Sequence, residues 1–204
     1  VEGAKNYSKE IKISREIKKE RLEEICEMIF IEENSLYYLS DEYILTHNAL
    51  TGKVTSIVLN YKYDYEELAY LNTMTEEKVA EILAKTDDSM SDVDKLRIFH
   101  DEIIFGCKYE TEGRYVSTPF GALVEGNALC EGYARAFKVL CDEAGIPCVL
   151  VDGEALGEPH MWNYVQMDDG KWYAVDVTWN DPSAQDVEEK VSGLVASLYT
   201  HFTP

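Results

Sequence analysis

The sequence lacks several features that would each indicate a class of protein. It has no run of eighteen apolar residues, so we expect no segment to span a membrane. It contains no glycine-rich phosphate loop and no internal repeat, so nucleotide-dependent chemistry is not indicated. Its 19 basic residues face 39 acidic ones, and the net charge of −20 argues against nucleic acid or an anionic membrane as a partner.

The cysteines are few, and their pattern excludes two common uses. There are five of them, an odd number with no Cys-x-x-Cys pair, which describes neither a disulfide framework nor a zinc site. We therefore expect at least one free thiol, and no metal or cofactor. Cys141 and Cys148 lie in apolar segments and are expected in the core, and Cys26 and Cys107 are given the same interpretation.

With 46% hydrophobic residues, the 204-residue chain can build a sizeable core. Residues 1 to 86 are expected to form a small α+β region. Ser14 would cap a helix running to Ile31, and Thr75 would cap a second one ending near Thr86. Aromatic and β-branched residues predict three strands, the last two forming a hairpin: Leu36–Leu39, Tyr43–His47 and Val54–Tyr63.

A second domain, residues 87 to 204, would follow the polar stretch Thr86–Met90. Ser91 or Asp92 begins a helix whose apolar face stops at Gly106. The tail from Ser183 onward receives no assignment.

Cys130 stands near the start of the most clearly patterned helix of the sequence. Asn127 is a strong N-cap, apolar residues then recur at helical intervals, and Gly145 would take the C′ position. The first turn of a helix carries unpaired N–H groups and the positive end of the dipole, which favour a thiolate over a thiol. The same N–H groups could receive the oxyanion of a tetrahedral intermediate.

His160 and Asp176 fall on two strands of a predicted hairpin, and the length of its loop decides whether they can meet. A two-residue turn at Asp169-Gly170 would place them on opposite faces, because side chains alternate along a strand. A three-residue loop, Asp168-Asp169-Gly170, with glycine left-handed, makes paired positions sum to 338. His160 then becomes the diagonal neighbour of Asp176 on one face, within bridging reach.

With the bulged loop, these groups suit thiol acyl chemistry. Asp176 can accept a hydrogen bond from one imidazole nitrogen of His160, and the other nitrogen can then take the proton of Cys130. We expect Trp162, Trp172 and Trp179 to belong to the core and the cleft wall, and Trp162, Asn163 and Trp179 to contact the substrate.

Three stretches resemble the transglutaminase-like core shared by transglutaminases, peptide N-glycanases and many bacterial proteins. They are ALCEGYARAFKVLCDEAGIPC, HMWNYV and KWYAVDVTWNDP, and the preceding IFHDEIIFGCKY resembles the helix that enters this core. The resemblance covers residues 92 to 182. It implies a papain-like α+β fold with the cysteine helix packed on an antiparallel sheet, and Cys130 as nucleophile, His160 as general base and Asp176 as orienting residue. The metal ligands of specialised members are not recognisable.

Two kinds of function follow from these observations. The first is a thiol acyl-transfer enzyme acting on peptide or protein amides, either a transglutaminase or a cysteine protease or amidase, and the three residues alone do not separate these. The alternative is a non-catalytic module that binds proteins or cell-wall peptides on the same fold. Because the first residue is not Met, we expect a trimmed chain that is secreted or held at the cell surface, with the cytoplasm as the alternative. The oligomeric state is not indicated.

Overall fold

The computed structural model describes residues 1–181, and the tail from Ser183 to Pro204 lies outside the described residues. By its internal contacts the chain divides into two compact units, Val1–Tyr70 and Leu71–Pro204. Both mix helices and strands, so the predicted α+β class is confirmed. The domain limits expected from the sequence, 1–86 and 87–204, stay a prediction.

The first unit is a three-stranded antiparallel sheet with helices. The sheet order is β1–β3–β2, and the predicted hairpin of β2 and β3 is present, with Gly52 in the left-handed region at φ +69°. The elements are α1 (Glu2–Lys5), β1 (Glu10–Ile17), α2 (Lys19–Glu32), η1 (Asn34–Leu36), β2 (Leu39–His47), β3 (Val54–Tyr61) and the first residues of α3 (Tyr65–Leu83).

Three local predictions for this part of the chain are wrong. Ser14 does not cap a helix but lies in β1, because pairing with β3 outweighs local capping preference, and α2 begins only at Lys19. The segment expected as a strand from Leu36 begins with the end of a 3₁₀ turn. Thr75 lies inside α3, where its hydroxyl donates to the carbonyl of Leu71 at 2.8 Å instead of capping an end.

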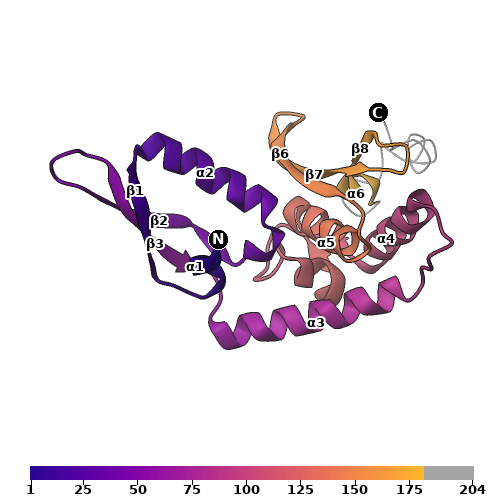
Figure 1. The fold of residues 1–204 in the computed structure, drawn as a ribbon. Helices are drawn as coiled ribbons and strands as arrows, with labels where there is room; N and C mark the ends of the chain where they lie inside the picture. The colour runs from indigo at the N-terminus through magenta and orange to yellow at the C-terminus, as the bar shows by residue number, and fades with distance from the viewer. Residues whose placement is uncertain (182–204) are drawn as a thin grey trace. The chain divides into compact units, whose positions relative to one another are not determined.

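The second unit packs helices against a second antiparallel sheet, of order β6–β7–β8. Helix α5 lies against this sheet with α4 beside it (Figure 1). Ser91 caps α4 by accepting from the N–H of Asp94, as the sequence predicts. The elements are α4 (Asp92–Gly106), β4 (Lys108–Tyr109), the π-helical turn η2 (Gly121–Glu125), β5 (Asn127–Ala128), α5 (Cys130–Glu143), β6 (Cys148–Ala155), β7 (Glu158–Gln166), β8 (Trp172–Val175) and α6 (Val177–Asn180).

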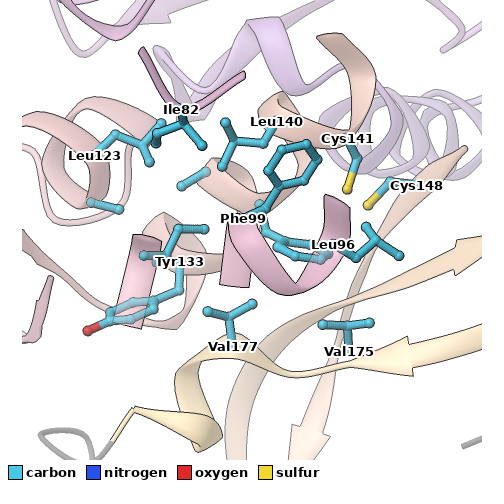
Figure 2. Close-up of a cluster of buried hydrophobic side chains, with 14 of the residues drawn as sticks. Ile82, Leu96, Phe99, Leu123, Tyr133, Leu140, Cys141, Cys148, Val175 and Val177 are labelled. Atoms are coloured by element: carbon cyan, nitrogen blue, oxygen red, sulfur yellow. The ribbon is translucent and has the colours of Figure 1, made fainter. Parts of the chain in front are cut away.

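The core of this unit lies between the helices and the sheet. Phe99 and Leu96 of α4 meet Leu140 of α5 and Val175 of β8, and the sulfur atoms of Cys141 and Cys148 lie close together at one end of the cluster (Figure 2). All five cysteines fall within the described residues and are free thiols, with Cys107, Cys141 and Cys148 buried as predicted and Cys26 only half-buried. The first turn of α5 therefore continues into a helix whose side chains are buried in this core.

Candidate active site

Cys130 is the first residue of α5, although the helix does not begin as the sequence suggested. Asn127 was expected as the N-cap, but it pairs with Lys108 in the parallel strands β4 and β5. The N-cap is Leu129, whose backbone N–H donates to the carbonyl of Val116 at 3.0 Å. Strand pairing therefore fixes the chain up to Cys130, and the first turn of the helix follows directly with its N–H groups lacking intrahelical acceptors.

The loop that contains Val116 lies directly on this first turn. A Cβ atom added at Gly132 would stand 2.3 Å from the carbonyl oxygen of Val116 and 2.8 Å from the Cβ of Ala128. Only glycine permits this approach, because both obstacles are backbone or the stub of a short side chain.

Replacing Gly132 by alanine is therefore expected to lower the free energy of unfolding by about 1–3 kcal/mol through overpacking. The gain in helix propensity of about 1 kcal/mol offsets part of this loss. Urea denaturation would measure the change. Gly106→Ala is the matched control, since the added methyl group at the end of α4 meets nothing within 4 Å. Equal stability of the two variants would contradict the close approach at Gly132.

The β7–β8 hairpin has the three-residue loop that the chemistry requires. Gln166 pairs with Trp172 and Asn163 with Val175, so paired positions sum to 338. Gly170 is left-handed at φ +74° and donates its N–H to the carbonyl of Met167. Of the two registers that the sequence left open, the structure has the one with the three-residue loop, and the two-residue turn is excluded.

His160 and Asp176 are joined by a short hydrogen bond. Nε2 of His160 lies 2.7 Å from Oδ2 of Asp176, and His160 is 8% exposed. The other carboxylate oxygen of Asp176 accepts the N–H of Trp179 at 3.0 Å and so caps α6. Both oxygens are engaged, which fixes the carboxylate in one orientation.

Cys130 completes the group from the side of α5. The pKa of His160 is raised to about 9, first by its hydrogen bond to Asp176 and next by its interaction with the neighbouring Cys130, while burial opposes the rise. Since Nε2 is bound to Asp176, Nδ1 is the ring nitrogen left to face the sulfur. The structure thus brings together the three residues that the sequence singled out.

Two tryptophans pack on the imidazole. The ring of Trp179 stacks on His160 at a centroid distance of 5.1 Å, and that of Trp162 at 5.9 Å. Trp162 has room because Gly153 stands opposite His160 on β6, where a Cβ would lie 2.8 Å from the indole. Trp179 is 42% exposed. Both rings confine His160, and Trp179 offers apolar surface beside it.

Asn163 lies elsewhere, so the expectation that it contacts substrate needs correction. Its side chain is fully buried, and its Nδ2 donates to the carbonyl of Ala134 at 3.0 Å and to Cys148 Sγ at 3.6 Å. Odd positions of β7 face α5, which is why the residue following Trp162 points inward. Asn163 therefore links β7 to α5 by a hydrogen bond in the core.

The structure adds residues near the site that the sequence analysis did not single out. The pKa of Tyr109 on β4 is raised by burial and then by the nearby Cys130 and Glu158. Tyr133, one turn beyond Cys130, bonds to Asp181 in the interior. The helical spacing of Tyr133 from Cys130 was visible in the sequence, but it indicated only an apolar face.

Among residues 1–181, no group of three or more His, Cys, Asp or Glu side chains is placed to hold a metal ion. Within the same residues, no helix is both long enough and apolar enough to cross a membrane.

A family model of the transglutaminase-like superfamily matches residues 76–177, which is half of the chain. The chain belongs to the transglutaminase-like superfamily. The resemblance drawn from the motifs around Cys130, His160 and Asp176 is confirmed at the level of the superfamily.

The curated relatives that the chain matches are distant and much longer. The kyphoscoliosis peptidase of Mus musculus is 27% identical over 129 residues, covering 55% of this chain and 19% of that protein. The human kyphoscoliosis peptidase is 25% identical over 141 residues, covering 61% of this chain and 21% of that protein. The chain therefore spans about a fifth of the length of these two relatives.

Solved structures of similar fold include a TGase, with a TM-score of 0.47 and 17% identity over 83% of this chain and 50% of that one. The periplasmic domain of TgpA from Pseudomonas aeruginosa, bound to ethylmercury, has a TM-score of 0.42 and 15% identity. That match covers 68% of this chain and 64% of the other.

Proposed function

We propose that this chain is a thiol acyl-transfer enzyme that acts on peptide or protein amide bonds. Cys130 is the nucleophile, His160 the general base and acid, and Asp176 the residue that orients the imidazole. One observation carries the proposal: His160 is hydrogen-bonded to Asp176 at 2.7 Å, and this bond together with the neighbouring Cys130 raises its pKa to about 9. At neutral pH the ring therefore holds a proton next to the sulfur, and an imidazolium stabilises a neighbouring thiolate.

The first half of the reaction uses this ion pair. The Cys130 thiolate attacks the carbonyl carbon, a C–S bond forms, and the carbonyl electron pair moves to oxygen. The free N–H groups at the start of α5 would hydrogen-bond this oxyanion. When the intermediate collapses, the C–N bond breaks and His160 gives its proton to the departing amine, which leaves a thioester on Cys130.

The second half restores the enzyme. Water or a second amine attacks the thioester while neutral His160 takes its proton, the C–S bond breaks, and the thiolate and imidazolium form again. Water yields a carboxylic acid, as in a peptidase or amidase, and an amine yields a new amide, as in a transglutaminase. The polar machinery is the same for both, so the acceptor is selected by the cleft and by exclusion of water.

Alkylation by iodoacetamide at about pH 6.5 is expected to proceed roughly tenfold faster at Cys130 than at Cys26. His160 is protonated at this pH and places a positive charge next to Cys130, whereas burial raises the pKa of the Cys26 thiol. Both residues are half-buried, so access is comparable. Mass spectrometry of peptides over a time course measures the two rates. Equal, slow labelling would contradict the proposal and favour a binding module.

Incubation with a glutamine-containing protein and a fluorescent primary amine would show whether water or an amine is the acceptor. Incorporation of the amine into the protein identifies a transferase. Release of ammonia without incorporation identifies an amidase, and new peptide ends in the protein identify a protease. Each product is expected to disappear when Cys130 has first been alkylated.

A further inference from the structure

The segment that follows Asp176 is held by two polar contacts in the interior. The hydroxyl of Tyr133 on α5 donates to Oδ2 of Asp181, just after α6. Next to it, the amide of Asn180 lies 3.0 Å from Nε2 of His100 on α4. Tyr133 is 0% exposed and Asp181 is 1% exposed. A carboxylate so deeply buried costs much desolvation free energy, which the contact with a phenolic hydroxyl partly recovers.

The Tyr133–Asp181 contact joins the two halves of the site. Tyr133 is three residues after Cys130, one turn further along α5, and Asp181 is five residues after Asp176. Between Asp176 and Asp181 the chain forms only the short helix α6, whose Val177 shares the core with Tyr133 (Figure 2). Movement of Asp181 would therefore move the carboxylate that holds His160.

Two groups at this contact, the Tyr133 hydroxyl and the Cys107 thiol, keep their protons near neutral pH, and the His100 imidazole lies at the adjacent Asn180. Burial, and then the bond to Asp181, raise the pKa of Tyr133 well above its usual range, so its hydroxyl remains a donor. Cys107 lies near the same hydroxyl, and burial raises the pKa of its thiol to about 11. The ring of Tyr109 packs 6.5 Å from that of Tyr133. The contact is thus expected to stay constant over the range in which His160 changes charge.

We propose that Tyr133 and Asp181 are positioning residues, whose hydrogen bond sets the separation between the Cys130 sulfur and the His160–Asp176 pair. The inference rests on the acyl-transfer function proposed above. Neither residue is assigned to contact substrate. Their effect reaches the reaction through the placement of Asp176 and, through it, of the imidazole.

The test is Tyr133→Phe, which removes one oxygen atom and keeps the buried ring. Alkylation of Cys130 at about pH 6.5 is expected to slow roughly tenfold, because a displaced imidazolium supports the thiolate less well. At about pH 10, where an ordinary thiol is ionised, the rate is expected to remain within about twofold of the wild-type rate. With substrate, kcat should fall about tenfold while KM changes less than about twofold.

Tyr173→Phe is the matched control. The Tyr173 hydroxyl also donates to a carboxylate, that of Asp169 at 2.7 Å, but in the exposed β7–β8 turn. This variant is expected to show the wild-type alkylation profile and kcat. If Tyr133→Phe also keeps the wild-type profile and only its melting temperature falls, the contact is merely structural and the inference is overturned.

Asp181→Asn serves if Tyr133→Phe fails to fold, since it keeps the volume and loses the charge. A roughly threefold or greater slowing of alkylation at about pH 6.5 supports the inference, and a wild-type profile overturns it. Failure of the proposed function would look different. Wild-type Cys130 would then react no faster than Cys26, and this is measured before any variant is compared.

Discussion

Replacing Cys130 by alanine is expected to lower kcat for amide cleavage or transfer by about 10⁴-fold or more. The reaction would lose its only nucleophile at the helix start, and the remaining thiols are poorly suited to replace it. Burial raises the pKa of Cys107 to about 11 and that of Cys141 well above its usual value, and Cys141 lies in the core (Figure 2). Product release under substrate saturation would measure the loss.

Cys26→Ala is the control for this experiment. It removes a half-buried thiol from the first unit and is expected to leave kcat unchanged. A Cys130→Ala variant that kept activity within about tenfold of the wild type would place the nucleophile elsewhere and end the proposed function.

Replacing Asp176 by asparagine is expected to lower kcat about 10²-fold and to move the alkaline limb of the kcat/KM profile to lower pH. His160 must carry a proton to expel the amine, so activity should fall as pH rises through the pKa of about 9. The carboxylate is the largest cause of that raised pKa, because it favours the charged imidazolium. The uncharged amide of asparagine favours the imidazolium less, so the alkaline limb of the kcat/KM profile should shift downward by about one pH unit or more.

The Asp176→Asn substitution is expected to change the pKa of His160 rather than the capping of α6. Asparagine caps helices well, so its oxygen can still accept the N–H of Trp179. Asp169→Asn makes the same change of charge in the exposed β7–β8 turn and is expected to keep the wild-type limb. An unshifted limb in Asp176→Asn would show that the carboxylate does not hold the proton on His160.

Local sequence signals were reliable where one strong physical rule acted alone. Gly170 marked the left-handed position of the β7–β8 loop, although the sequence permitted either loop length and the structure selected the three-residue one. Ser91 predicted the start of α4, and Gly145, left-handed at φ +73°, the end of α5. Each of these signals depends on a turn or a helix end, whose residue preferences are set within a few residues.

The signals failed where a partner distant in the sequence decided the outcome. Asn127 and Ser14 are both suitable caps, yet both lie in strands: Asn127 pairs with Lys108 of β4, and Ser14 lies within β1, which pairs with β3 on either side of it. Asn163 was expected at the cleft and is buried against α5. Polarity alone does not tell whether an amide meets a substrate or satisfies a backbone carbonyl in the core.

The sequence by itself determined which reactive groups this protein has and roughly where they stand: a cysteine at a helix start, a histidine on a hairpin strand and an aspartate at the end of the returning strand. Only the tertiary structure decided their chemical state. The short bond to Asp176 and the interaction with Cys130 raise the pKa of His160 to about 9, against the lowering effect of burial. Such a shift depends on distances between segments remote in sequence, because interactions between charges and hydrogen-bonding groups fall off within a few ångströms and strengthen as water is excluded.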